Sequence, residues 1–103
     1  MILHNTTFVI VPAIERQFLQ WMQNEYLPAI RSEETFHDAL LTKIKPHADA
    51  EAEDALSFAL QFKAPDEESV GALWNGKASE ILSRQQKVFG ESMLMFSTVM
   101  EII

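Results

Sequence analysis

The side chains that could take part in chemistry are few and are scattered along the sequence. Histidine is the residue type whose charge ordinarily changes near neutral pH, and the chain has three: His4, His37 and His47. A metal site needs several ligands close together, and only the neighbours His37 and Asp38 approach this arrangement, with side chains on opposite sides of a strand. We therefore expect no metal site and a structural or solvated role for each histidine.

Neutral polar side chains recur at alternate positions of two segments that have strand character. Asn5 and Thr7 share one face of the first segment, and Ser57 and Gln61 share the less apolar face of the other. These groups could converge on a ligand, or they could satisfy one another or hold ordered water. His4 and Tyr26 join the set because either one, reaching into a cavity, would favour chemistry there. The candidate ligand-binding residues are Asn5, Thr7, Ser57, Gln61, His4 and Tyr26.

Composition excludes several kinds of chemistry and partner. Without cysteine the chain can form no disulfide, thiolate nucleophile, iron-sulfur cluster or sulfur-based zinc site. Its three glycines fit no phosphate-binding motif, and we expect no nucleotide or other cofactor. The formal net charge of -7 repels nucleic acid and anionic membrane surfaces, so neither is an expected partner.

Length and hydrophobicity predict one domain that spans residues 1–103. The chain has 103 residues, of which 48% are hydrophobic, enough for one thin core. The N-terminus has no basic leader, and the longest apolar stretch, at residues 8–14, is far shorter than the ~20 residues that cross a bilayer. We expect a cytoplasmic protein.

The spacing of apolar residues predicts six regular elements. Alternation and β-branched or aromatic residues indicate strands, and spacings of three and four indicate helices. The strands are expected at residues 2–11, 36–45, 56–63 and 92–103, and the helices at residues 14–30 and 66–89. Pro28 predicts a kink or an early stop in the first helix. The acidic segment 47–54 predicts a solvated hairpin loop, since it lacks the glycine that a calcium loop needs.

The order strand, helix, strand, strand, helix, strand predicts an α+β, ferredoxin-like βαββαβ domain. In this arrangement two helices cover one face of a four-stranded antiparallel sheet. The first and last strands carry large side chains on both faces, so the second face needs a cover. We expect a homodimer in which two sheets pack face to face as a barrel. Which face of the first strand lines the barrel stays open, because both faces carry apolar and polar residues.

The chain also resembles a known group across almost its whole length. The segments that carry the resemblance are Asn5-Thr6-Thr7, Phe18-Leu19-Gln20-Trp21-Met22, Tyr26-Leu27-Pro28, residues 57–62, Phe89-Gly90 and residues 96–101. They are similar to small uncharacterised bacterial proteins of the dimeric α/β-barrel, antibiotic-biosynthesis-monooxygenase-like superfamily. The resemblance implies a dimeric α/β barrel, and the family has no assigned activity. Related proteins often have histidine where Tyr26 stands and arginine where Ser97 stands, and these differences remove an obvious base and an obvious anion clamp.

Three functions fit these observations. The first is an uncharacterised homodimer that binds a small, mostly apolar molecule inside the barrel. The second, implied by the resemblance alone, is a cofactor-independent monooxygenase-like enzyme. The third is a purely structural dimer. An enclosed cavity reached by His4 or Tyr26 would favour the enzyme, and a packed interior would favour the structural dimer.

Overall fold

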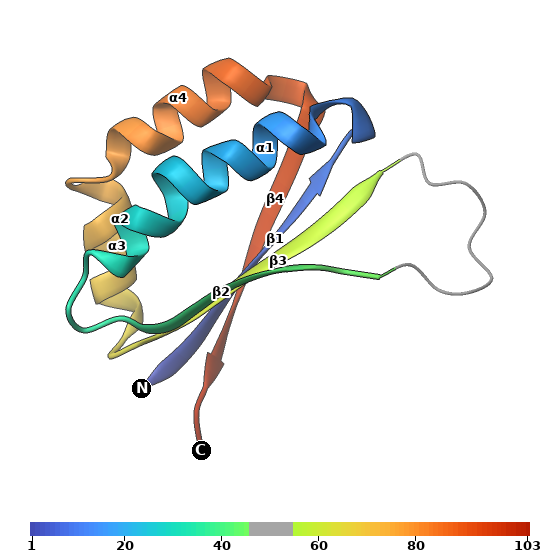
Figure 1. Cartoon of the computed structure of the whole chain (residues 1–103). Helices are drawn as coiled ribbons and strands as arrows, with labels where there is room; N and C mark the ends of the chain where they lie inside the picture. Colours follow the sequence, from blue (N-terminus) through green and yellow to red (C-terminus); the bar gives the residue numbers. More distant parts are fainter. Residues whose placement is uncertain (46–54) are drawn as a thin grey trace.

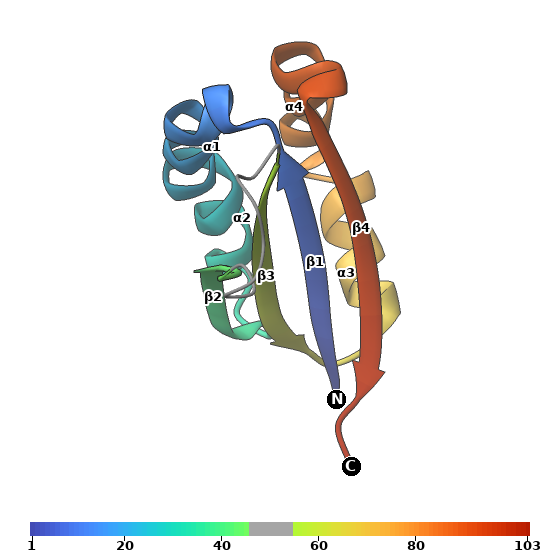
Figure 2. The same ribbon diagram turned by 90° about the vertical axis from the view of Figure 1, so that its right-hand side faces the viewer.

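The computed structural model describes residues 1–45 and 55–103, which form one four-stranded antiparallel sheet with helices on one side (Figure 1). The predicted hairpin loop at 47–54 lies outside the described residues. After a turn of 90° about the vertical axis, the sheet lies in front of the helices and its near face carries none of them (Figure 2). The predicted α+β, ferredoxin-like arrangement is thus confirmed.

The sheet has the strand order β2-β3-β1-β4, so the first and third strands form its middle. The strands are β1 (Ile2–Ile10), β2 (His37–Lys43), β3 (Leu56–Ala64) and β4 (Met93–Glu101). β1 pairs with β3 and β4 along its whole length, and β2 pairs only with β3. β4 is shorter at both ends than predicted, because Ser92 ends a short helical turn and Ile102 lies beyond the strand.

The first helical segment contains an irregular turn in its middle. It consists of η1 (Pro12–Ile14), α1 (Glu15–Trp21), η2 (Met22–Tyr26) and α2 (Leu27–Arg31), which follow one another directly. η2 is π-helical, and Pro28 lies in the first turn of α2. Because proline has no N–H to donate, a change of helical type just before it is a natural response. The irregularity expected at Pro28 is therefore present, and the helix continues to Arg31.

The single helix predicted over residues 66–89 is wrong, because the structure contains two. α3 (Glu67–Asn75) and α4 (Ser79–Phe89) are separated at Gly76, and η3 (Gly90–Ser92) follows α4. Gly76 has a non-helical backbone, with φ −111° and ψ −117°, and an added Cβ would lie 2.5 Å from the carbonyl oxygen of Ala72. Lys77 lies in the turn between α3 and α4 and is exposed, whereas Gln85 and Phe89 of α4 are buried.

The core lies between the helices and the sheet and is rich in aromatic rings. The strict alternation predicted for β3 is confirmed, because Phe58, Leu60 and Phe62 are at most 2% exposed. Phe18 from α1 packs on Phe58 with 5.0 Å between ring centroids, and Phe8 from β1 lies 5.4 Å from Phe18. These contacts fix which face of β1 meets the helices and therefore which face is left uncovered.

Candidate functional site

Four of the candidate residues lie on the sheet face that the helices leave uncovered, here called the open face. Asn5 on β1 is directly opposite Gln61 on β3 and Thr98 on β4. Directly paired residues of antiparallel strands point to the same face. Thr7 is the next residue of β1 on this face, and Ser57 lies further along β3 on the same face. The strands thus bring together Asn5, Thr7 and Gln61, with Ser57 toward one end.

The open face differs between its middle and its edges. The two middle strands present mostly polar or small side chains, with Leu3 and Val9 at the ends of the row on β1. The edges present large apolar side chains, which are strongly exposed. On and just beyond the edge strands these are Leu94 (68% exposed), Phe96 (58%), Met100 (39%), Leu40 (56%) and Ile44 (46%). Exposed apolar side chains gathered on one face in this way mark an interaction surface or a binding site.

Hydrogen bonding in the middle of the open face is incomplete. Asn5 Nδ2 donates to Thr7 Oγ1 over 3.3 Å. Asn5 Oδ1 is buried and has no hydrogen-bond partner within residues 1–45 and 55–103. On this face of β1, β3 and β4, Lys63 is the one charged residue, and its Nζ lies 3.0 Å from a carboxylate oxygen of Asp38 on β2. The open face is therefore close to neutral and retains one unsatisfied amide atom.

His4 lies on the opposite, helix-covered side of the sheet. It is 8% exposed, and its ring lies 5.1 Å from that of Phe62. Burial lowers the pKa of His4, and the nearby carboxylate of Glu67 opposes this change only in part. The sheet itself separates the imidazole from Asn5, although the two residues are adjacent in the chain.

Tyr26 also lies in the packed layer between helices and sheet. It is 2% exposed, with its ring 4.6 Å from Trp74 and 5.5 Å from Phe8. Burial raises the pKa of the Tyr26 hydroxyl well above its usual range. The structure therefore brings neither His4 nor Tyr26 to the four polar residues of the open face.

Sequence reasoning missed Thr98 as a neighbour of the polar group. Alternation places Thr98 on one face of β4, but only the pairing of β4 with β1 sets it opposite Asn5. The neighbouring residue, Ser97, faces the helices, where its hydroxyl lies 3.0 Å from that of Thr6. The position at which related proteins often have arginine is thus occupied here by a small, hydrogen-bonded side chain.

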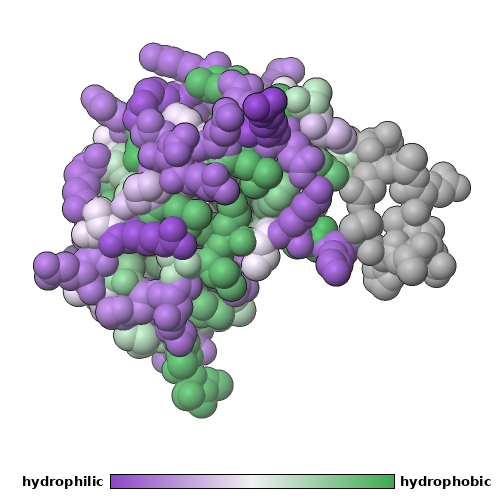
Figure 3. Space-filling view, viewed as in Figure 1, coloured by the Kyte–Doolittle hydropathy of each residue, from purple (hydrophilic) through white to green (hydrophobic). Residues whose placement is uncertain are grey.

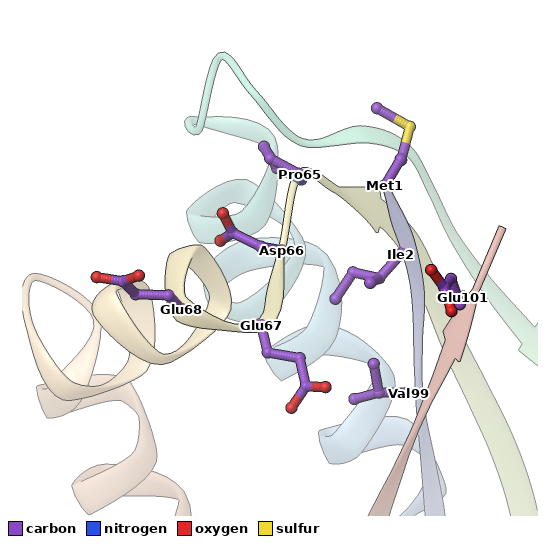
Figure 4. Close-up of a pocket in the computed structure, with 8 residues that line it drawn as sticks. All are labelled: Met1, Ile2, Pro65, Asp66, Glu67, Glu68, Val99 and Glu101. Atoms are coloured by element: carbon purple, nitrogen blue, oxygen red, sulfur yellow. The ribbon is translucent and has the colours of Figure 1, made fainter.

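A separate hollow of about 570 Å³ lies where the N-terminus meets the start of α3 (Figure 4). Its lining combines apolar side chains with the carboxylates of Asp66, Glu67, Glu68 and Glu101. Asp66 caps α3, since its Oδ1 accepts from the Ser69 hydroxyl over 2.7 Å and from the Ser69 backbone N–H over 2.8 Å, and these bonds lower the pKa of Asp66. In the part of the chain that the structure describes, no cluster of three potential metal ligands occurs. The same residues include no helix that could span a membrane.

The sheet order and the helices on one face define an α+β, ferredoxin-like domain. Solved structures with the same fold share little sequence with it. One is an EthD family protein from Bacillus halodurans, with TM-score 0.70, 15% identity and full coverage of both chains. Another is a putative antibiotic biosynthesis monooxygenase from Deinococcus radiodurans, with TM-score 0.73 and 10% identity, covering 100% of this chain and 93% of the other.

The family itself is set by sequence. The chain belongs to the family described as Domain of unknown function (DUF4286), which matches residues 1–103. A third similar structure, an antibiotic biosynthesis monooxygenase, has TM-score 0.62 and 12% identity, covering 100% of this chain and 99% of the other. At these identities the likeness shows the fold alone. Among curated proteins none matches the chain. The family resemblance seen in the sequence is thereby confirmed.

Proposed function

We propose that this protein is a homodimer whose two open faces pack together and enclose a site for a small, mostly apolar molecule. The observation that carries the proposal is the open face itself, with exposed apolar side chains along its edges and small or polar side chains in its middle. A second copy is the occupant that brings an equally apolar, nearly neutral surface. The whole chain carries a net charge of -7, but the open face adds little repulsion, because Lys63 is paired with Asp38.

The size of the open face suits a dimer interface. Three of the four strands have nine residues and the other has seven. At about 3.3 Å per residue and about 4.8 Å between strands, the face measures roughly 30 by 19 Å. Two such faces bury about 1,100 Å² of flat area, and the relief of the side chains adds to this, which reaches the lower range of specific interfaces.

Room for a ligand follows from the uneven height of the side chains. Packed sheets lie about 10 Å apart, and large side chains from both sheets normally fill that space. Here Phe96 and Leu94 stand at one edge, whereas Thr7, Ala59 and Ser57 in the middle are short. When two such faces pack together, the large side chains at the edges would meet while the short side chains in the middle are still apart. A cavity lined by small and polar groups would remain between them.

The monooxygenase-like alternative has less support. Two structural neighbours are called antibiotic biosynthesis monooxygenases, one of them putative, but they share only 10% and 12% identity with this chain. An acid-base role in the barrel would need a titratable group within hydrogen-bond reach of the bound molecule. His4 and Tyr26, the candidates for that role, are buried on the other side of the sheet. A purely structural dimer is the remaining alternative, in which the middle of the interface is filled or holds water.

Two measurements on the purified protein test the proposal. Light scattering at micromolar concentration should give the mass of a dimer, and a monomeric mass with folded circular dichroism would refute it. Titration with the neutral dye Nile red should then show saturable fluorescence enhancement, and native mass spectrometry of protein from its own cell should show a retained small molecule. A dimer that neither binds the dye nor retains a molecule would be structural.

A further inference from the structure

We propose that the outer edge of β4 pairs with β4 of a second copy, antiparallel about a twofold axis at Ser97, in an interface separate from the open face. The inference goes beyond the proposed function, because it adds a second contact through which face-to-face dimers assemble further. It is carried by the difference between the two edges of the sheet, one of which is blocked and the other free.

The edge formed by β2 is blocked against pairing. The register of β2 with β3 shifts between His37 and Leu40, and Asp38 within this bulge has a positive φ of 57°. The Arg31 guanidinium donates to the backbone carbonyl of Ala39 over 3.2 Å, so a strand added here would lose that acceptor. Bulges and charged side chains at an edge are devices by which proteins keep edge strands from pairing.

The edge formed by β4 has none of these devices among the described residues. β4 pairs with β1 over nine residues without a shift of register, and it is the outermost strand of the sheet in Figure 2. Its sequence contains no proline, glycine, lysine or arginine, and its one charge is Glu101 at the end. Every residue of β4 after Met93 is exposed. A long, regular and apolar edge of this kind is a site to which another strand adds.

Alternate residues of β4 direct their backbone groups to this free edge. The N–H of Val11 donates to the carbonyl of Ser92. The N–H of Ile102 donates to the carbonyl of Met1, so the bonds to β1 fall on the even-numbered residues of this segment. The odd-numbered residues therefore direct N–H and C=O outward, where no strand of the described chain pairs with them. These residues are Met93, Met95, Ser97, Val99 and Glu101.

A second copy of β4 matches this edge in hydrogen bonds and in side chains. Antiparallel pairing with Ser97 opposite its own copy sets outward residues opposite outward residues. Nine paired residues then form about ten hydrogen bonds, the number in a typical specific interface. Leu94 lies opposite Met100 on one face of the joined sheet, and Met95 lies opposite Val99 on the other. Apolar side chains therefore meet on both faces.

Glu101 selects this register over the others. With Ser97 at the axis, Glu101 of one copy faces Met93 of the other, and the two Glu101 carboxylates are roughly 26 Å apart, far beyond the Debye length of about 8 Å. A register centred on Glu101 would set the two carboxylates directly opposite each other. That arrangement is unfavourable, above all between chains that each carry a net charge of -7.

Two interfaces on each protomer lead to a larger assembly. Where the twofold axis of the open face crosses that of the β4 edge, four copies close into a tetramer of two continuous eight-stranded sheets, since each copy supplies four strands. One strand edge buries less area than a whole sheet face, so the dimer forms first and the tetramer at higher concentration.

The test follows mass and amide exchange from micromolar to millimolar concentration. Light scattering of the wild type should rise from the mass of a dimer toward that of a tetramer. Hydrogen exchange followed by NMR should slow about tenfold or more at the amides of Met95, Ser97 and Val99 as the tetramer forms. Val99→Pro removes one outward N–H without taking a bond from β1, and it should remain a dimer throughout. The matched control Val99→Ala loses the same side chain, keeps the N–H and should still form the tetramer.

Each contrary outcome overturns a definite step. A mass that stays at two protomers, with fast amides on β4, would overturn the edge pairing, leave the edge to a strand of another protein and keep the face-to-face dimer. Slow outward amides on both β4 and β2 within the dimer would mean that the partner's β2 closes the barrel, and a tetramer unaffected by Val99→Pro would use another surface. Either result would overturn the edge pairing.

Two results separate this inference from the proposed function. A dimer that Val99→Pro converts to a monomer at micromolar concentration would support the edge pairing and refute the face-to-face packing. If Val99→Pro does not fold, the concentration dependence of the wild-type β4 amides decides, because only pairing at this edge slows them.

Discussion

Replacing Phe96 by serine should dissociate the proposed dimer without unfolding the protomer. Phe96 is 58% exposed on the open face, so its ring adds little to the protomer's own core. With about 200 Å² for a phenylalanine, a second copy would cover roughly 100 to 120 Å² of it. At about 25 cal/mol per Å² this is about 3 kcal/mol for each protomer, counted twice in a symmetric dimer. Such area sums are upper bounds, so half of the total for the dimer is a safer figure. That half, about 3 kcal/mol, raises the Kd about a hundredfold.

The assay compares three proteins by light scattering over a concentration series. Wild type should remain dimeric at micromolar concentration, and Phe96→Ser should become monomeric there with unchanged far-ultraviolet circular dichroism. The control is Val88→Ser, which removes an apolar side chain of 49% exposure from α4, in the helix layer. Val88→Ser should leave the mass of the dimer unchanged. Dissociation by Val88→Ser but not by Phe96→Ser would place the interface on the helices and refute the reasoning.

Three further outcomes are expected within the protomer. Phe62→Ala should lower the free energy of unfolding in urea by about 3 to 5 kcal/mol, the cost of a buried phenylalanine. Lys63→Ala, which loses an exposed ion pair, should change it by less than about 1 kcal/mol. Equal losses would contradict the assignment of faces on β3. Because the pKa of His4 in the folded protein is lowered from 6.5, the unfolded state binds more protons than the folded state as the pH falls below that value, and stability should fall as pH drops from 7.5 toward 5. The Tm of His4→Phe should lose this pH dependence, while the Tm of the exposed control His37→Gln keeps it. Asp66→Ala should lower the Tm at pH 7 more than Asp66→Asn, which retains a capping oxygen, and since the pKa of this carboxyl is lowered, the difference from wild type should shrink in acid.

The fold could be predicted from the sequence because each strand has a local pattern of alternating residues that identifies it. In β3 every second residue is large and apolar, and Phe58, Leu60 and Phe62 are all buried against the helices. The break between α3 and α4 was not predictable in the same way. Glycine suits the break, because a Cβ on residue 76 would lie 2.5 Å from the carbonyl oxygen of Ala72, and this depends on the conformation of the turn and not on the spacing of apolar residues.

The candidate site was predictable within each strand and not between strands. Alternation alone groups Asn5 with Thr7 and Ser57 with Gln61, and it also places His4 on the face opposite to Asn5. What it could not supply is the register that sets Asn5 opposite Gln61 and Thr98, since pairing joins residues 56 and 93 positions apart. The exposed C-terminal end, which projects as a hydrophobic tip beyond the sheet in Figure 3, likewise becomes visible only in the folded molecule.

The sheet divides the side chains that could do chemistry into two sets. The titratable candidates, His4 and Tyr26, lie in the packed layer, where burial holds the imidazole and the phenol in their neutral forms near pH 7. The open face keeps amide and hydroxyl groups, which can orient a molecule but exchange no proton at that pH. A reaction between the two sheets would therefore have to use the acidity of the bound molecule itself. This division is what favours binding over catalysis in the proposed function, and it would change only if the molecule covering the open face supplied an acid or a base of its own.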